Sequence, residues 1–399
     1  MSNPNHRSAL VFMIDGLSPR YLSPYGCTWV QTPAMDQLTA ESITFERAVA
    51  EAVDLQLVNQ SLMSGWHPLA CQQGEPGFEV VDECRKADVE SWLLTDDPVL
   101  LKSVERRLES SGGFDHIVAL PSAAQFKQSA ESLEDTHLAS CFAQVIQDLP
   151  QRSPPFLLVV HLTSLTQVWD APLAMRERHR DEEDPEVPDF VVPPNRTVDA
   201  TGIDPDEIHA ITCAYAAQVE TLDTCLDVLL QETRADGMLD KMLVCLTGLR
   251  GFPLGHNNQV GHHRDHLFSD ATSIPVMVRD PYSGLGPFRT HELTTSRQVL
   301  PFAVNWITGE MPAQENGQHA SPLPSPACLV TIGESTRAIT TPAWLMIDHG
   351  STQQLFVKPD DRWDVNPVHD RCRWIVDDLL QLLDMAAEQL AINQPLSIG

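Results

Sequence analysis

The strongest constraint on the fold is a series of five short runs in which nearly every residue is apolar. The runs cover residues 9–14, 92–94, 156–160, 242–246 and 274–278. A strand that is apolar on both faces is typical of a sheet covered by helices on each side, because neither face meets water. The runs therefore predict an α/β fold with a mainly parallel sheet flanked by helices on both faces.

Helical patterns separate these runs. Thr32 followed by Pro33 predicts an N-cap and the first turn of a helix. A longer helix is predicted between the third and fourth runs, because apolar residues recur there at steps of three or four and form one stripe. The residues of this stripe are Ile208, Ile211, Tyr215, Val219, Leu222, Leu226 and Leu229.

The last part of the chain has a different pattern. Residues 328–332, 343–347 and 354–357 predict short antiparallel strands, and residues 371–390 predict a closing helix. The apolar side of this helix is expected to carry Trp374, Ile375, Leu379, Leu382 and Leu383. We therefore expect an α/β domain over residues 1–311 and a small C-terminal subdomain, an antiparallel sheet plus a helix, over residues 328–399.

Two stretches interrupt the pattern of strands and helices. Residues 176–206 are acidic and rich in proline, which predicts an exposed loop. Residues 312–327 contain proline, glycine, serine and glutamine and are typical of a linker.

The charge of the chain limits its partners. The formal net charge is −29 over 399 residues. A surface this acidic repels nucleic acids and anionic membranes, so neither is expected as a partner. The nine cysteines are scattered without a C-x-x-C motif, which favours reduced thiols. No secretory h-region precedes the first apolar run, and we expect a cytoplasmic protein.

Several segments, in order along the chain, resemble the sulfatase family of the alkaline-phosphatase superfamily. They are ALVFMIDGLSPRYLSPYG, TPAMDQLTAESITF, SLMSGWHP, PFLLVVHLTSLTQVWDAP, LVCLTGLRGFPLG, ESTRAITTPAWLMIDHG and QLFVKPDDRWDVNPV. Their order and spacing match the family over most of the chain, except for residues 69–155 and the acidic loop. The resemblance implies the sulfatase fold, with a pocket at the carboxyl ends of the parallel strands.

The resemblance also places the family's functional positions on this chain. The first metal aspartate matches Asp15, which is present, and the second matches Gly16. The nucleophile that sulfatases convert to formylglycine matches Leu55. The arginine that supports this nucleophile matches Asn59, and the histidine of the family's Pro-His pair matches Thr166.

The remaining family positions are also replaced. The Asp-His metal pair matches Leu249 and Arg250. A lysine and a histidine of the family fall near Thr95 and Asp97, and its second lysine falls near His263 or Arg264. We call Asp15, Gly16, Leu55, Asn59, Thr166, Leu249 and Arg250 the vestigial pocket.

The vestigial pocket lacks the chemistry of a sulfatase. Leucine has no lone pair and cannot become formylglycine, although a register shift by one residue would bring the carboxylate of Asp54 to the nucleophile position. Calcium binds about six to eight oxygens, which the single carboxylate of Asp15 cannot supply. A guanidinium 4 Å from a dication would cost about 8 kcal/mol at an effective dielectric near 20. No catalytic residue is therefore assigned.

Arg250 is the natural replacement for the metal. Asp15 and Arg250 follow two strands that hold one ion in the family, so a bidentate ion pair between them is predicted. The other possibility is that Asp15 caps the following turn while Arg250 points into solvent.

A second group of polar residues lies in the segment GHNNQVGHHRDH. His256, His262, His263 and His266, together with Asp265, could bind zinc or a similar ion, and Asp15 is a further candidate ligand. Histidines in loops are more commonly solvated polar residues, and this spacing matches no zinc signature.

Three functions remain open. The chain is either an inactive sulfatase-like protein that binds a small molecule or a protein in a regulatory role, an active sulfuric-ester or phosphate-ester hydrolase with a remodelled centre, or a structural partner of another protein. The first requires no cofactor, whereas the second requires calcium or another divalent cation. We expect the first, a pseudoenzyme.

Overall fold

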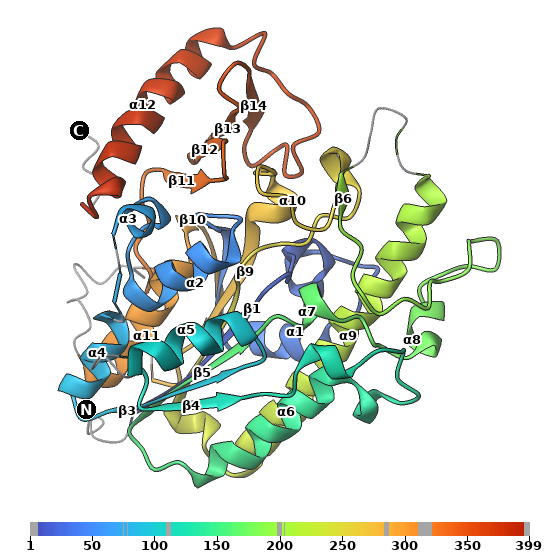
Figure 1. The fold of residues 1–399 in the computed structure, drawn as a ribbon, viewed down its shortest axis with the longest axis vertical. Coiled ribbons are helices and arrows are strands. Elements are labelled where there is room, and N and C mark those ends of the chain that lie inside the picture. The colour runs from blue at the N-terminus through green and yellow to red at the C-terminus, as the bar shows by residue number, and fades with distance from the viewer. Residues whose placement is uncertain are drawn as a thin grey trace.

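A large sheet forms the centre of the computed structural model, which describes residues 7–74, 76–77, 79–108, 113–197, 202, 204–282, 287–309 and 321–394 (Figure 1). Its strands are β1 (Ser8–Ile14), β2 (Ile43–Val49), β3 (Glu90–Thr95), β4 (His116–Ala119), β5 (Phe156–Leu162), β7 (Met242–Gly248), β9 (Ser273–Arg279) and β10 (Phe288–Thr294). They lie in the order β10-β2-β9-β7-β1-β5-β3-β4, and only β9 runs antiparallel to its neighbours. The predicted mainly parallel sheet is confirmed, and each of the five apolar runs is a strand.

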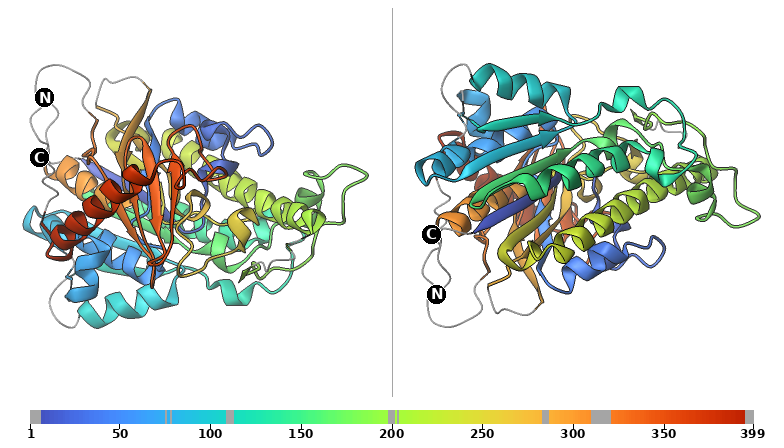
Figure 2. Two further views of the ribbon diagram at one scale, coloured as in Figure 1. Left: turned by 90° about the horizontal axis from the view of Figure 1, so that it is seen from above. Right: turned by 90° about the horizontal axis from the view of Figure 1, so that it is seen from below.

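Helices cover both faces of this sheet (Figure 2). Alternate residues of β1 enter opposite cores, because successive side chains of a strand point to opposite faces. Val11 and Met13 pack with α2 (Leu55–Ser64), α4 (Glu79–Lys86), α5 (Pro98–Leu108) and α11 (Val299–Thr308). Leu10 and Phe12 pack with α1 (Pro33–Thr39), α6 (His137–Asp148) and α9 (Pro205–Ala235). The helix predicted from its apolar stripe is therefore α9, and none of the described helices is long and apolar enough to cross a bilayer.

A second, antiparallel sheet lies at one end of the molecule, near α3 (Pro68–Gln73) and α10 (Ser269–Thr272). Its strands follow chain order: β11 (Leu329–Ile332), β12 (Arg337–Thr340), β13 (Trp344–Asp348) and β14 (Gln353–Val357). β12 was not among the predicted strands. α12 (Arg373–Ala391) packs on α3 and on this sheet. The backbone amide of Ile332 donates to the carbonyl of Glu51 at 3.0 Å, so the two sheets are directly connected.

The buried face of α12 differs in one residue from the prediction. Val376, Leu379 and Leu383 are buried, but Trp374 is 63% exposed. Trp374 lies two residues before Val376, and at 3.6 residues per turn this places it about 200° around the helix from the buried stripe. The expected position of Trp374 on the packed side is therefore wrong.

The described part of the acidic segment 176–206 is largely an exposed loop, as predicted, but it is anchored at two points. Arg176, at the end of α8 (Leu173–Glu177), is fully buried and donates to the carbonyls of Trp169, Ala171, Pro188 and Phe190. Further along, β6 (Arg196–Thr197) pairs with β8 (Gln259–Val260). Four carbonyl acceptors satisfy the guanidinium without a carboxylate partner.

The predicted linker and domain boundary can be placed only in part. Residues 310–320 lie outside the described residues, so the boundary at 311 and most of the linker at 312–327 stay predictions. All nine cysteines are free thiols.

The start of α1 is capped from a distant helix. Thr32 occupies the N-cap position, but its side chain makes no capping hydrogen bond. Asp223 of α9 instead accepts from the amides of Ala34 and Met35, at 3.0 and 2.9 Å. The cap thus joins α1 to α9, which lie on the same face of the large sheet.

We predict that Asp223→Ala lowers the free energy of unfolding by about 1–2 kcal/mol, because two amides at a helix start lose their acceptor. Urea unfolding followed by circular dichroism measures the change. Glu232→Ala, an exposed acidic residue of the same helix, should change it by less than about 0.5 kcal/mol. Equal effects of the two variants would show that the cap is not stabilising.

Candidate functional site

The vestigial pocket lies where β1, β5 and β7 end. In the register of the sheet, Ile14 of β1 is paired with Leu162 of β5 and Gly248 of β7. Backbone hydrogen bonds continue beyond the strands: the amide of Asp15 donates to Leu162, and the amide of Leu249 donates to Ile14. The residues that follow the three strands are therefore adjacent, at the carboxyl edge where such folds place their sites.

Asp15 and Arg250 form the ion pair that was predicted. Arg250 Nε lies 2.8 Å from Asp15 Oδ1, and Arg250 Nη2 lies 2.6 Å from Asp15 Oδ2. Thr166, in α7 (Ser164–Gln167), donates its hydroxyl to Asp15 Oδ2 at 2.9 Å. Asp15 is fully buried and Arg250 is 7% exposed. The bidentate geometry confirms the ion pair and excludes the solvent-facing arginine.

The electrostatics of Asp15 follow from these contacts. Burial raises the pKa of its carboxyl, but the charge and hydrogen bonds of Arg250 lower it more, so that it falls from 3.8 to about 2. The carboxylate is thus ionised and paired at neutral pH.

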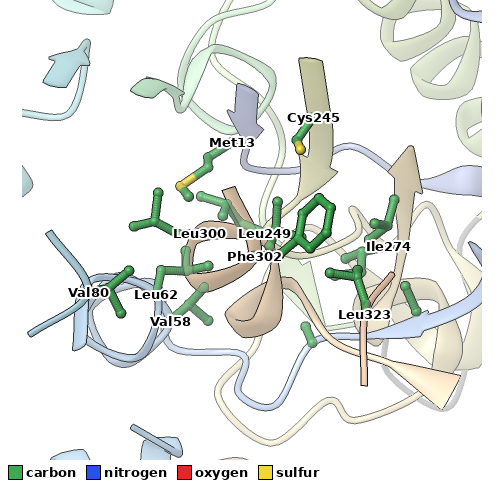
Figure 3. Packing of buried hydrophobic residues seen from close by; sticks show 14 of the residues in the cluster. Met13, Val58, Leu62, Val80, Cys245, Leu249, Ile274, Leu300, Phe302 and Leu323 are labelled. Carbon is green, nitrogen blue, oxygen red and sulfur yellow. The ribbon is translucent and has the colours of Figure 1, made fainter. Parts of the chain in front are cut away.

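These residues do not fit a divalent cation. Both oxygens of Asp15 accept from the guanidinium, and Arg250 would repel a dication. Leu249 is fully buried in the apolar cluster on the α2 side of the sheet, where it lies near Leu300 and Phe302 (Figure 3). One paired carboxylate and a core leucine leave too few oxygens for calcium.

The nucleophile position is held next to the ion pair. Arg250 Nη1 donates to the carbonyl of Val53, two residues before Leu55, at 2.5 Å. Leu55 is the first residue of α2 and packs against the apolar cluster. Asp54, the alternative nucleophile, is the N-cap of α2: its Oδ1 accepts from the amides of Gln56 and Leu57, at 2.9 and 3.1 Å. Its carboxylate therefore already has a structural role.

Asn59 has joined a buried hydrogen-bond chain. Asn59 Oδ1 lies 2.9 Å from His161 Nε2, and Thr95 Oγ1 lies 3.0 Å from His161 Nδ1. The amide nitrogen of Asn59 donates to Asp97 Oδ2 at 3.4 Å. Burial lowers the pKa of His161, which favours a neutral ring. Its Nε2 then donates to Asn59 while its Nδ1 accepts from Thr95.

A neighbouring buried group was not predicted from the sequence. The possible ligand atoms of Asp96, His137 and Cys141 lie within 4.8 Å of one another. Ser164 Oγ lies 3.0 Å from both Asp96 Oδ2 and His137 Nδ1, whereas Cys141 Sγ lies 3.5 Å from His137 Nε2, on the other ring nitrogen. In this arrangement Ser164 joins Asp96 to His137 in a buried hydrogen-bond network.

The hydrogen bonds of that network fix the role of one ring nitrogen. The carbonyl of Pro121 lies 2.7 Å from His137 Nε2, which must therefore donate. Burial raises the pKa of the Asp96 carboxyl, whose oxygens accept from the hydroxyl of Ser164 at 3.0 Å and from the amide and hydroxyl of Thr163 at 2.7 and 2.9 Å.

The four loop histidines do not converge on one point, since the described residues contain one cluster of three potential metal ligands, that of Asp96, His137 and Cys141. His266 Nε2 pairs with Asp270 at 2.7 Å, and both are buried, so the expectation of a solvated side chain is wrong for His266. His263 is exposed. His256 is partly buried, and its pKa is lowered mainly by burial.

His262 lies beside the ion pair. Burial and the charge of Arg250 lower its pKa to about 3. Its Nε2 is buried and has no hydrogen-bond partner within the described part of the chain. His262 is therefore a neutral imidazole next to the ion pair. Of the two positions expected near the family's second lysine, His263 is exposed and Arg264 pairs at the surface with Glu334.

Comparisons with known proteins identify the fold. No protein-family model and no curated protein matched the sequence. Among solved structures, BT4656, determined in complex with its substrate D-glucosamine-2-N,6-O-disulfate, is similar with a TM-score of 0.74 and 14% identity over 98% of this chain and 99% of that one. The phosphonate monoester hydrolase of Agrobacterium radiobacter has a TM-score of 0.72 and 14% identity, over 96% of both chains.

A third structure, BT1596, a 2-O GAG sulfatase, has a TM-score of 0.71 and 13% identity over 96% of this chain and 92% of that one. Over nearly its whole length, the chain therefore has the fold of these sulfatase and phosphonate monoester hydrolase structures.

The ion pair gives a prediction for stability. Arg250→Ala should lower the free energy of unfolding by about 3–5 kcal/mol, because it leaves the buried Asp15 charged and unpaired. Asp15→Asn should cost less, since it removes the fully buried charge and keeps an acceptor for Arg250. Denaturant unfolding of both single variants and of Asp15→Asn/Arg250→Ala measures this. The double variant should be more stable than Arg250→Ala alone, and the reverse order would contradict the role of the pair.

The lowered pKa of Asp15 gives a second prediction. A carboxyl with a lower pKa in the folded state stabilises the fold above its unfolded pKa and loses this contribution as the pH falls through its folded pKa. The wild-type protein should therefore lose about 2 kcal/mol of stability from this group between about pH 4 and pH 2. Asp15→Asn should lack that part of the pH dependence. Identical stability–pH profiles would show that the pKa of Asp15 is the same in the folded and unfolded states, which would contradict this prediction.

Proposed function

We propose that the chain is a sulfatase-fold protein that has lost catalysis and acts as a binding or regulatory protein. The observation that carries this proposal is the ion pair of Asp15 and Arg250, which replaces the cation of the family with a fixed guanidinium. Loss of the formylglycine position at Leu55 supports it independently, because neither leucine nor the capping carboxylate of Asp54 is a free nucleophile.

The partner is a small molecule or a protein, and the cytoplasm is the proposed location. The sulfated aminosugar bound by BT4656 is a rational first ligand class to screen. Its sulfate groups would meet few cations in this pocket, because Asn59, Thr95, Asp97 and Thr166 stand at positions that are basic or imidazole groups in the family. The bound ligand is therefore expected to differ from that of sulfatases.

The competing function is an active hydrolase with a remodelled centre, which would require calcium or another divalent cation. No contact among the described residues favours it, since the acidic group nearest the old metal position is neutralised by Arg250. A role as a structural partner of another protein remains the second competitor, and it would leave the pocket without a ligand.

We predict that purified protein carries no stoichiometric calcium, magnesium or zinc and does not hydrolyse 4-nitrophenyl sulfate or 4-nitrophenyl phosphate. Elemental mass spectrometry measures the metals, and absorbance at millimolar substrate with each added cation measures turnover. Asp15→Ala and Leu55→Cys serve as comparators. Metal-stimulated hydrolysis that Asp15→Ala abolishes would replace this proposal with the hydrolase.

A further inference from the structure

A cavity of about 320 Å³ opens beside the vestigial pocket, between α2 and α5. Its volume lies at the lower end of the range that is typical of small-molecule binding sites. Its lining includes Asn59, Met63, Leu100, Lys102, Ser103 and Arg106. Asn59 lines this cavity and is also a residue of the vestigial pocket. The cavity therefore adjoins the buried hydrogen bond between Asn59 and His161.

The lining divides into an apolar part and a polar rim. Met63 and Leu100 are buried, at 2% and 6% exposure, and they form the apolar part of the cavity lining. Asn59 is held in place by its hydrogen bonds to His161 and Asp97, which leaves this wall pre-organised. The apolar part of a bound ligand would pack against protein side chains that are already ordered. The protein would therefore lose little conformational entropy on binding.

The rim carries positive charge in a strongly acidic protein. Among the described residues that line the cavity, only Lys102 and Arg106 are charged, whereas the chain has 55 acidic and 26 basic residues. They lie one helical turn apart on α5, where like charges repel. Neither forms an ion pair with a carboxylate in the described part of the chain. An anionic group between them would relieve the repulsion and gain charge-assisted hydrogen bonds.

We propose that this cavity binds a small organic anion with an apolar body, such as an aryl or acyl carboxylate or sulfonate. The anionic group would lie between Lys102 and Arg106, with Ser103 as a further donor, and the apolar body would pack against Met63 and Leu100. The inference rests on the proposed function by naming the ligand class of a protein that binds without turnover.

The test uses fluorescence titration with 8-anilinonaphthalene-1-sulfonate on the full chain. Its sulfonate has a carbon–sulfur bond and is not an ester, so binding is measured independently of any hydrolysis. N-phenyl-1-naphthylamine has the same rings without the anion. The wild-type protein should bind the sulfonate at least about tenfold more tightly than the neutral amine, a factor typical of one charge-assisted contact.

Matched variants separate the cavity from general charge. Lys102→Gln/Arg106→Gln should weaken sulfonate binding about tenfold and leave the neutral amine unchanged. Arg178→Gln/Arg373→Gln removes two exposed charges elsewhere and should bind both probes like wild type. Ser103→Trp, at an exposed rim position, should block both probes by filling the cavity, and thermal melts verify that each variant is folded.

The outcomes are distinct. Unchanged sulfonate affinity in Lys102→Gln/Arg106→Gln, an equal loss in the control pair, or full binding to folded Ser103→Trp would each overturn the proposed site. Detection of sulfatase turnover would instead overturn the proposed function and leave the binding result standing.

Discussion

The bidentate contact between Arg250 and Asp15 is the interaction around which the carboxyl edge of the large sheet is arranged. Through it, the end of β7 contacts the end of β1, Thr166 after β5, and the carbonyl of Val53 before α2. A bound cation in this place would stabilise the fold only in proportion to its concentration and affinity. A guanidinium encoded in the chain is always present, so the geometry of the edge no longer depends on an ion.

The charge balance of the edge follows from the same contact. Arg250 is neutralised by Asp15, and the pKa values of His161 and His262 are lowered by burial, so neither ring contributes positive charge at neutral pH. The vestigial pocket therefore has little attraction for a sulfate or phosphate ester. Within the described part of the chain, Lys102 and Arg106 are cations without a carboxylate partner, and they lie at the cavity on the other side of Asn59. The anion site that we propose is therefore distinct from the ion pair of Asp15 and Arg250.

The strands and the ion pair could be predicted from the sequence where a local residue pattern agreed with the resemblance to the sulfatase family. The five apolar runs are strands because they are buried on both faces, and the ion pair was predictable because two strand ends were matched to one site. The strands β2, β4 and β10 of the large sheet were missed. The edge strand FRTHELT is half-exposed, and charged residues interrupt ITFERAV of β2, so neither has a continuous apolar run. Asp96, His137 and Cys141 come from three distant segments, and no local spacing indicates their network. The anchoring of Arg176 depends on four carbonyls from the loop around it, which sequence patterns do not reveal.

Gly16 limits which side chains the end of β1 can carry. Its φ is +81°, and a Cβ at this position would lie 2.6 Å from Thr166 Cγ2 and 3.3 Å from Leu165 Cβ. An aspartate at this position would adopt a left-handed backbone conformation that residues with a side chain rarely adopt, and it would displace the threonine that donates to Asp15. The backbone after β1 therefore favours the hydrogen bond between Thr166 and Asp15 over a second carboxylate beside it.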